Sequence, residues 1–200
     1  MSISAKDIKV LREKTGAGFM DCKKALEDSN GDFEKAYDFL RKKGLATAAK
    51  RADRDASEGV VELYSHGDGR VGVMVEVNCE TDFVARSESF RTLAHEIALQ
   101  IAALSPQYVS EDQIPEEILA KELEIARARA IEEGKPEKML DRIATGRVEK
   151  FKDEFVLLRQ AYIRNDKLTI QEYLHENVAS IGENIVIRRF TRWELGKTSN

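Results

Sequence analysis

The sequence predicts an α+β fold, with a bundle of three short helices at the N-terminus and then a core in which a small three-stranded antiparallel sheet packs on helices. Apolar residues recur at helical spacing up to about residue 44 and then alternate with a period of two over residues 59–78. A second alternating run near the C-terminus supplies the third strand. Two charged helical segments between these runs predict a helical hairpin that projects from the core.

Residues 4–44 are expected to form the bundle. Ser4 and Asp7 match a capping box at the start of the first helix. Glycines mark the later boundaries, with Gly16 and Gly18 after the first helix, Gly31 after the second and Gly44 at the end of the third. The apolar positions available for a shared core are Ile8, Leu11, Phe19, Cys22, Leu26, Phe33, Ala36, Tyr37 and Leu40. These positions suffice for a small core.

A change of composition marks a domain boundary near residue 55. Residues 45–58 are rich in alanine and charge and contain no large apolar residue after Leu45, which predicts a helical or flexible linker. We therefore expect a helical module with its linker at residues 1–55 and a core domain at residues 56–200.

The core is expected to begin with a β-hairpin covered by a helix. Two alternating runs flank the Gly-rich turn "HGDG", and the second run places four valines on one face: Val71, Val73, Val75 and Val77. A helical stripe follows, made of Phe90, Leu93, Ala94, Ile97, Ala98, Ile101 and Ala102. This stripe is the natural cover for the valine face.

The helical hairpin is predicted at residues 116–153. A charged helix follows Pro115 and stops at Gly134, and a second helix from Pro136 runs to about Thr145, with one or two further turns before Phe155. Because charge lies on most faces, we expect the hairpin either to contact a partner or to support assembly.

The last strand is expected to follow a capped helix. Thr169 and Glu172 match a second capping box, and Gly182 ends that helix. The strand then places two residues on one side, Ile185 and Ile187, and three on the other, Val186, Arg188 and Phe190.

Composition restricts the function. Charged residues make up 34% of the 200-residue chain and the net charge is −4, which argues against a dedicated nucleic-acid binder. A basic cluster is the exception: Arg41, Lys42, Lys43, Lys50, Arg51 and Arg54. Binding of a polyanion there is an alternative, although basic residues near helix ends more often complement the helix dipole.

The two cysteines, Cys22 and Cys79, and the charged first ten residues favour a reducing, cytoplasmic location. The sequence has no apolar run of the roughly 18 residues that a membrane span requires, so we expect no membrane association.

Catalytic motifs are sparse. Three histidines, His66, His95 and His175, lack the spacing of a zinc site. The sequence contains neither of the glycine-rich motifs that bind nucleotide phosphates, GxxxxGK[ST] and GxGxxG. Cys79 near Asp82 is either a nucleophile or, more simply, a small buried side chain at a strand end. We expect no enzymatic activity, no cofactor, no metal and no direct nucleotide binding, and a function in recognition.

Four segments resemble the elongation factor Ts family, the exchange factors of the GTPase elongation factor Tu. They are "LREKTGAGFMDCKKAL" (11–26), "VNCETDFVAR" (77–86), "GKPEKMLDRIATGRVEKF" (134–151) and "IGENIVIRRF" (181–190). They occur in the family order and span nearly the whole chain. The resemblance implies that the chain binds elongation factor Tu with GDP and promotes GDP release, which allows GTP to rebind.

The resemblance also assigns a role to each region. The N-terminal module resembles a bundle of the ubiquitin-associated (UBA) type that docks on the nucleotide-binding domain of elongation factor Tu. Its candidate contact residues are Arg12, Gly16, Phe19, Met20 and Lys23. Residues 116–153 resemble the family's coiled-coil hairpin. Longer members carry two related core halves, so this short form is expected to be a homodimer.

In the family, the segment matching Thr81, Asp82, Phe83 and Val84 displaces the magnesium ion of the bound nucleotide. We call these four residues the corner. The resemblance implies that Phe83 inserts between two helices of the GTPase while Asp82 holds nearby polar groups. Two alternatives stay open: Phe83 caps this protein's own core, or the module is a ubiquitin-like recognition domain on an unrelated scaffold.

Overall fold

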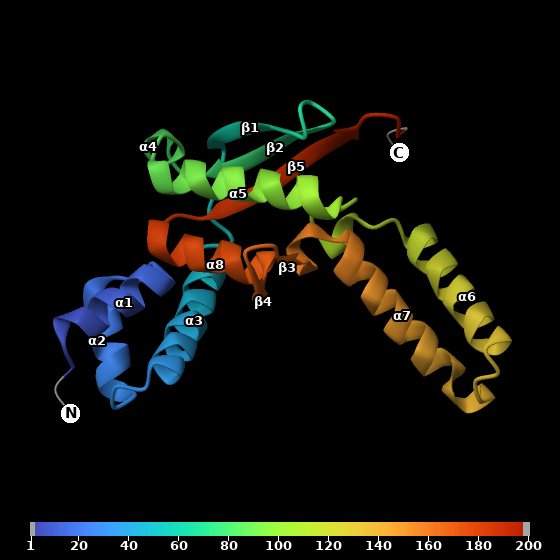
Figure 1. Cartoon of the computed structure of the whole chain (residues 1–200), viewed down its shortest axis with the longest axis horizontal. Helices are drawn as coiled ribbons and strands as arrows, with labels where there is room; N and C mark the ends of the chain where they lie inside the picture. The colour runs from blue at the N-terminus through green and yellow to red at the C-terminus, as the bar shows by residue number, and fades with distance from the viewer. Residues whose placement is uncertain (1–2, 198–200) are drawn as a thin grey trace.

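A three-stranded sheet and helix α5 form the centre of the molecule, with the N-terminal helices at one end and a helical hairpin at the other (Figure 1). The computed structural model describes residues 3–197. The α-helices are α1 (Ala5–Thr15), α2 (Phe19–Asp28), α3 (Phe33–Ala49), α4 (Asp82–Ala85), α5 (Glu88–Leu104), α6 (Glu116–Glu132), α7 (Leu140–Phe155) and α8 (Ile170–Ile181). The strands are β1 (Glu58–His66), β2 (Val71–Cys79), β3 (Ala161–Tyr162), β4 (Asn165–Thr169) and β5 (Ile185–Glu194). The predicted α+β class is confirmed.

Helices α1 to α3 form the predicted bundle. The Ser4–Asp7 capping box is present, and Gly16 ends α1 in the left-handed conformation with φ 64°. The buried core consists of Ile8, Leu11, Cys22, Ala25, Leu26, Ala36 and Leu40. Phe19 was expected in this core, but it is 47% exposed. It is the first residue of α2, and the core begins one turn later, at Cys22.

The prediction that Gly44 stops the third helix is wrong, because α3 continues through it to Ala49. Gly44 is buried where α3 packs on α8, and a Cβ there would lie 3.6 Å from Ala179 Cβ. The glycine therefore packs against α8 inside the helix and does not cap it. The first part of the expected linker is accordingly helical.

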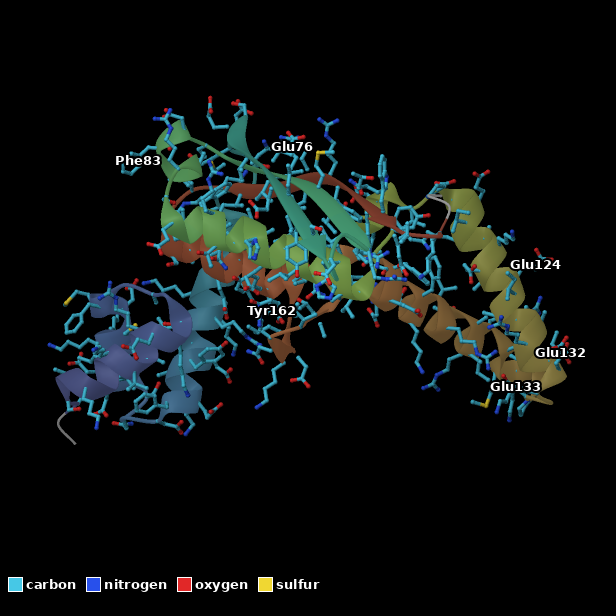
Figure 2. All side chains as sticks on the ribbon, turned by 45° about the horizontal axis from the view of Figure 1, so that its top comes forward. Glu76, Phe83, Glu124, Glu132, Glu133 and Tyr162 are labelled. Carbon is cyan, nitrogen blue, oxygen red and sulfur yellow. The ribbon has the colours of Figure 1, made fainter. Side chains whose placement is uncertain are left out.

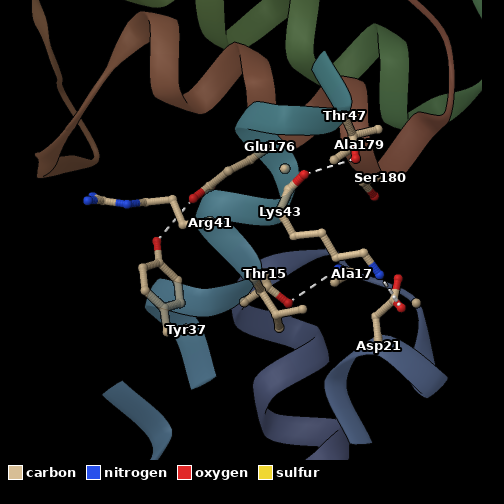
Figure 3. Close-up of a pocket in the computed structure, with 13 residues that line it drawn as sticks. Thr15, Ala17, Asp21, Tyr37, Arg41, Lys43, Thr47, Glu176, Ala179 and Ser180 are labelled. Carbon is tan, nitrogen blue, oxygen red and sulfur yellow. Dashed lines mark hydrogen bonds and ion pairs between the residues drawn. The ribbon is translucent and has the colours of Figure 1, made fainter. Parts of the chain in front are cut away.

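Polar contacts hold the module against α8 (Figure 3). The Tyr37 hydroxyl donates to Glu176 Oε1 at 3.2 Å, and Ser180 Oγ donates to the Gly16 carbonyl at 2.9 Å. Burial, reinforced by the charge of Glu176, raises the pKa of Tyr37 to about 12. The phenol therefore stays protonated and keeps its role as a donor.

Helix α5 covers one face of the sheet, whose strand order is β1-β2-β5 with both pairs antiparallel. The valine face and the helical stripe meet as predicted, and Val75, Val77, Phe90 and Ile97 are fully buried. Burying side chains of this size stabilises a fold by about 1.5–3 kcal/mol each. This contact forms the main core of the molecule.

A β-bulge in β5 changes which residues face α5. Val77 pairs with Ile187, whereas the preceding Glu76 pairs with Arg189, so Arg188 is an extra residue. Phe190 consequently lies opposite Val75 and packs against the main core. The expectation that Phe190 faces away from Ile187 is wrong for this reason.

The outer face of the sheet carries exposed apolar side chains: Val61, Leu63, Met74 and Trp193. Leu63 is 70% exposed and Trp193 is 68% exposed. A groove of about 340 Å³ runs between Leu63, Met74 and Trp193. This face is left open by residues 3–197.

Helices α6 and α7 form the predicted hairpin (Figure 1), but α7 runs on to Phe155 and does not end near Thr145. Alanines allow the two helices to approach, since Ala126, Ala130 and Ala144 are buried. At the base of the hairpin, Arg159 forms ion pairs with Glu111, Glu149 and Asp153 at 2.7–2.8 Å. The adjoining β3–β4 ribbon was not predicted, because such short strands have no resolvable period.

Gly59→Ala is expected to lower the free energy of unfolding by about 3 kcal/mol, because a residue with φ 148° is strained once it carries a Cβ. The new atom would also meet the Val77 carbonyl oxygen and lie 2.7 Å from Asn78 Cα. Urea unfolding measures the change. Gly146→Ala, in the open middle of α7, is the control and should gain about 1 kcal/mol. Equal stability of the two variants would contradict the close β1–β2 approach.

Candidate functional site

The corner is a single helical turn between the end of β2 and the start of α5. Thr81 is the N-cap of α4, and its side chain accepts the Val84 backbone N–H at 3.3 Å. Ser87 then caps α5 by accepting the Phe90 backbone N–H at 3.3 Å. Two successive caps therefore fix the direction of the chain at this point.

Phe83 points outward from this turn and is 82% exposed (Figure 2). The next two residues point inward, since Val84 and Ala85 belong to the main core. The turn is thus anchored by its second half and presents its first half to solvent. The alternative that Phe83 caps the protein's own core is wrong.

Asp82 is also exposed and pairs with Arg86, with Oδ2 and Nη2 2.8 Å apart. Exposed pairs of this kind contribute at most about 1 kcal/mol. Both groups are therefore free to exchange this contact for one with another molecule.

Cys79 supports the corner from beneath. It is fully buried, and its thiol donates to the Thr81 carbonyl, with Sγ and O 3.2 Å apart. Burial, followed by the negative charge of Glu183, raises the pKa of the Cys79 thiol to about 11. A fully buried thiol with this pKa is neutral near pH 7, which favours the interpretation of Cys79 as a small buried side chain at a strand end.

Three residues that were not predicted as site residues connect the corner to the rest of the fold. Glu183 accepts hydrogen bonds from Glu80 and Thr81, and Glu80 accepts one from the Asn184 backbone N–H at 2.6 Å. The Asn184 side-chain amide donates to the carbonyls of Ala52 and Arg54 in the linker. The only sequence signals for them were the family-like segments that contain them, "VNCETDFVAR" for Glu80 and "IGENIVIRRF" for Glu183 and Asn184.

The candidate residues of the N-terminal module lie away from the corner, at the same end of the molecule (Figure 1). All five are exposed: Arg12, Gly16, Phe19, Met20 and Lys23. Met20 is 69% exposed and follows the exposed Phe19, and Lys23 lies about one helical turn further along α2. Gly16 is different, because its left-handed φ and its contact with Ser180 give it a structural role.

Within the described part of the chain, no three His, Cys, Asp or Glu side chains gather as a metal site requires. His95 Nδ1 lies 2.9 Å from Glu62 Oε1, and His66 Nδ1 lies 2.9 Å from the Tyr64 hydroxyl. None of the helices within residues 3–197 combines the length and apolar character needed to cross a membrane.

Comparisons with known proteins agree with the sequence resemblance. The family described as Elongation factor TS matches residues 47–197. The elongation factor Ts of Moorella thermoacetica is 58% identical over 195 residues, which cover 98% of this chain and 96% of the relative. That of Caldanaerobacter subterraneus subsp. tengcongensis is 59% identical, covering 98% of each chain, and that of Anaeromyxobacter sp. strain K is 58% identical, covering 98% and 89%. This chain belongs to the elongation factor Ts family.

Proposed function

We propose that this protein binds elongation factor Tu in its GDP form and promotes release of GDP by displacing the bound Mg²⁺, after which GTP rebinds. The exposed Phe83 on a doubly capped turn, in a chain of this family, carries the proposal. The protein itself needs neither a cofactor nor a nucleotide site for this function.

The physical basis is the strict geometry of Mg²⁺. The ion requires a near-ideal octahedron of oxygens, and in GTPases it bridges the phosphates and protein groups. A small shift of the elements that carry those groups therefore removes a ligand. Insertion of the Phe83 ring between two helices of the GTPase would produce such a shift.

The size of one aromatic contact limits what Phe83 contributes. Burying this side chain is worth about 1.5–3 kcal/mol, which corresponds to a roughly ten- to hundred-fold weakening of GDP binding. Reciprocity requires that GDP weaken the binding of this protein by the same factor as this protein weakens the binding of GDP.

The remaining binding energy is assigned to the N-terminal module. Phe19 and Met20 offer an apolar contact, and Arg12 and Lys23 are exposed cations of the same module. The module and the corner lie at the same end of the molecule, so one partner can contact both (Figure 1). In this proposal the module supplies affinity and the corner supplies displacement of the ion.

Phe83→Ala is expected to slow the stimulated release of a fluorescent GDP analogue from elongation factor Tu by about ten- to hundred-fold. Stopped-flow fluorescence at saturating exchange factor measures this rate. The penalty should shrink when Mg²⁺ is removed with a chelator, because the ion is then already absent. Leu104→Ala, which removes an exposed apolar side chain at the far end of α5, should leave release unchanged. A Phe83→Ala variant as fast as the wild type would refute the role of this ring.

We also propose that two copies of the chain associate through the outer face of the sheet. Val61, Leu63, Met74 and Trp193 form one continuous apolar surface on adjacent strands, with Glu76 and Arg189 paired beside it at 2.8 Å. Exposed apolar surfaces of this kind mark interaction sites. A twofold axis would place the same surface of each copy against the other, replacing the second core half of longer family members.

Leu63→Glu is expected to convert the dimer into a monomer, because it places an unpaired charge in an apolar interface. Sedimentation equilibrium at micromolar concentration measures the mass, and circular dichroism shows whether the fold is kept. Ile131→Glu on the exposed helical hairpin is the control and should remain dimeric. A monomeric wild-type protein would contradict the proposed association.

A further inference from the structure

Glu183 makes a dense set of contacts with the corner. It lies in the loop between α8 and β5, directly after Gly182, which turns the chain with φ 93°. Its Oε2 accepts the backbone N–H groups of Glu80 at 3.0 Å and Thr81 at 3.1 Å. Its Oε1 accepts the Thr81 hydroxyl at 2.7 Å. One carboxylate thus binds three donors from two consecutive residues just before Phe83.

The contact with the Thr81 hydroxyl determines how Thr81 caps α4. Because the hydroxyl hydrogen points to Glu183, the oxygen lone pairs are left for the Val84 backbone N–H at 3.3 Å. Helix α4 has only four residues, and a helix this short is not stable without outside support. Glu183 therefore supports the turn that carries Phe83.

A second carboxylate makes the same connection in the opposite direction. Glu80 Oε1 accepts the Asn184 backbone N–H at 2.6 Å, so each loop provides a carboxylate to the backbone of the other. Hydrogen bonds to ionised acceptors are shorter and stronger than neutral ones. The β2–α4 and α8–β5 loops are consequently held as one unit, although about a hundred residues separate them in sequence.

We infer that Glu183 is a positioning residue for nucleotide exchange: its carboxylate holds the corner so that Phe83 is presented in the orientation needed for insertion. This inference rests on the proposed function. An exposed aromatic side chain on an unsupported turn would sample many directions, and ordering it on binding would cost affinity. Ordering the turn in advance removes that cost from the binding step.

The inference is tested first in the free protein. In Glu183→Ala, amide hydrogen exchange at Thr81 and Val84 should become at least tenfold faster, whereas exchange in the middle of α5 should be unchanged. Glu133→Ala is the matched control, since it removes a glutamate with two 2.7 Å contacts to Arg147 in the helical hairpin. Unchanged exchange at both corner amides would overturn the inference whatever the function of Phe83.

The second test measures stimulated release of a fluorescent GDP analogue at saturating exchange factor. Glu183→Ala should slow release about tenfold, equal to roughly 1.4 kcal/mol. Glu183→Gln should stay within about twofold of the wild type, because its amide oxygen still accepts the two N–H groups and its NH₂ can donate to the Thr81 oxygen. A Gln variant as slow as the Ala variant would overturn the assigned hydrogen bonds.

A double-mutant cycle separates this inference from the proposed function. If Glu183 acts through Phe83, Glu183→Ala should have no further effect in a Phe83→Ala background. Additive effects of the two substitutions would overturn the inference while leaving the role of Phe83 intact. A Phe83→Ala variant that releases GDP as fast as the wild type would instead refute the proposed function.

Thr81→Val removes the hydroxyl that donates to Glu183 without altering the α8–β5 loop, so it should slow GDP release as Glu183→Ala does. Normal release by Thr81→Val would count against the inference.

Discussion

The packing of α5 on the inner face of the sheet is the contact on which the rest of the structure depends. Val75 and Val77 meet Phe90 and Ile97 with no exposed surface, and this contact fixes where β2 ends and where α5 begins. The corner is the short connection between these two fixed points. A core that is covered on one side only also leaves the opposite face of the sheet open, so this one packing arrangement determines the position of the corner and of the surface proposed for dimer formation.

The corner shows how a chain keeps an aromatic side chain in water without losing order. Val84 and Ala85 anchor the turn in the core, Thr81 and Ser87 satisfy the backbone donors at the two helix starts, and Cys79 satisfies a carbonyl from below. Each of these contacts is local or buried, and none involves Phe83 itself. The free energy that orders the turn therefore comes from groups other than the one proposed to contact the partner.

The features that the sequence predicted well are those determined by neighbouring residues. The capping boxes at Ser4 and Thr169 and the left-handed glycines at Gly16 and Gly182 all appear as expected, because cap chemistry acts over three or four residues. Predictions failed where contacts with residues distant in the sequence determine the local structure. Gly44 looks like a helix end until α8 packs against it, and nothing local indicates the bulge that turns Phe190 inward. The composition of the corner was visible in the sequence, but the exposure of Phe83 and the support from Glu183 depend on contacts across the fold.

The extra residue at Arg188 has a consequence for how β5 can vary. Side chains alternate between the two faces along a strand. Before the bulge the odd-numbered residues of β5 face α5, and beyond it the even-numbered ones do. Arg192 reaches the Ala102 carbonyl on the inner side, and Trp193 lies on the outer side, only because that single insertion is present. Deleting one residue at the bulge would exchange the faces of Arg192 and Trp193, so that the Trp193 ring would face α5 in place of the Arg192 guanidinium. The number of residues in this strand therefore constrains the fold in addition to their type.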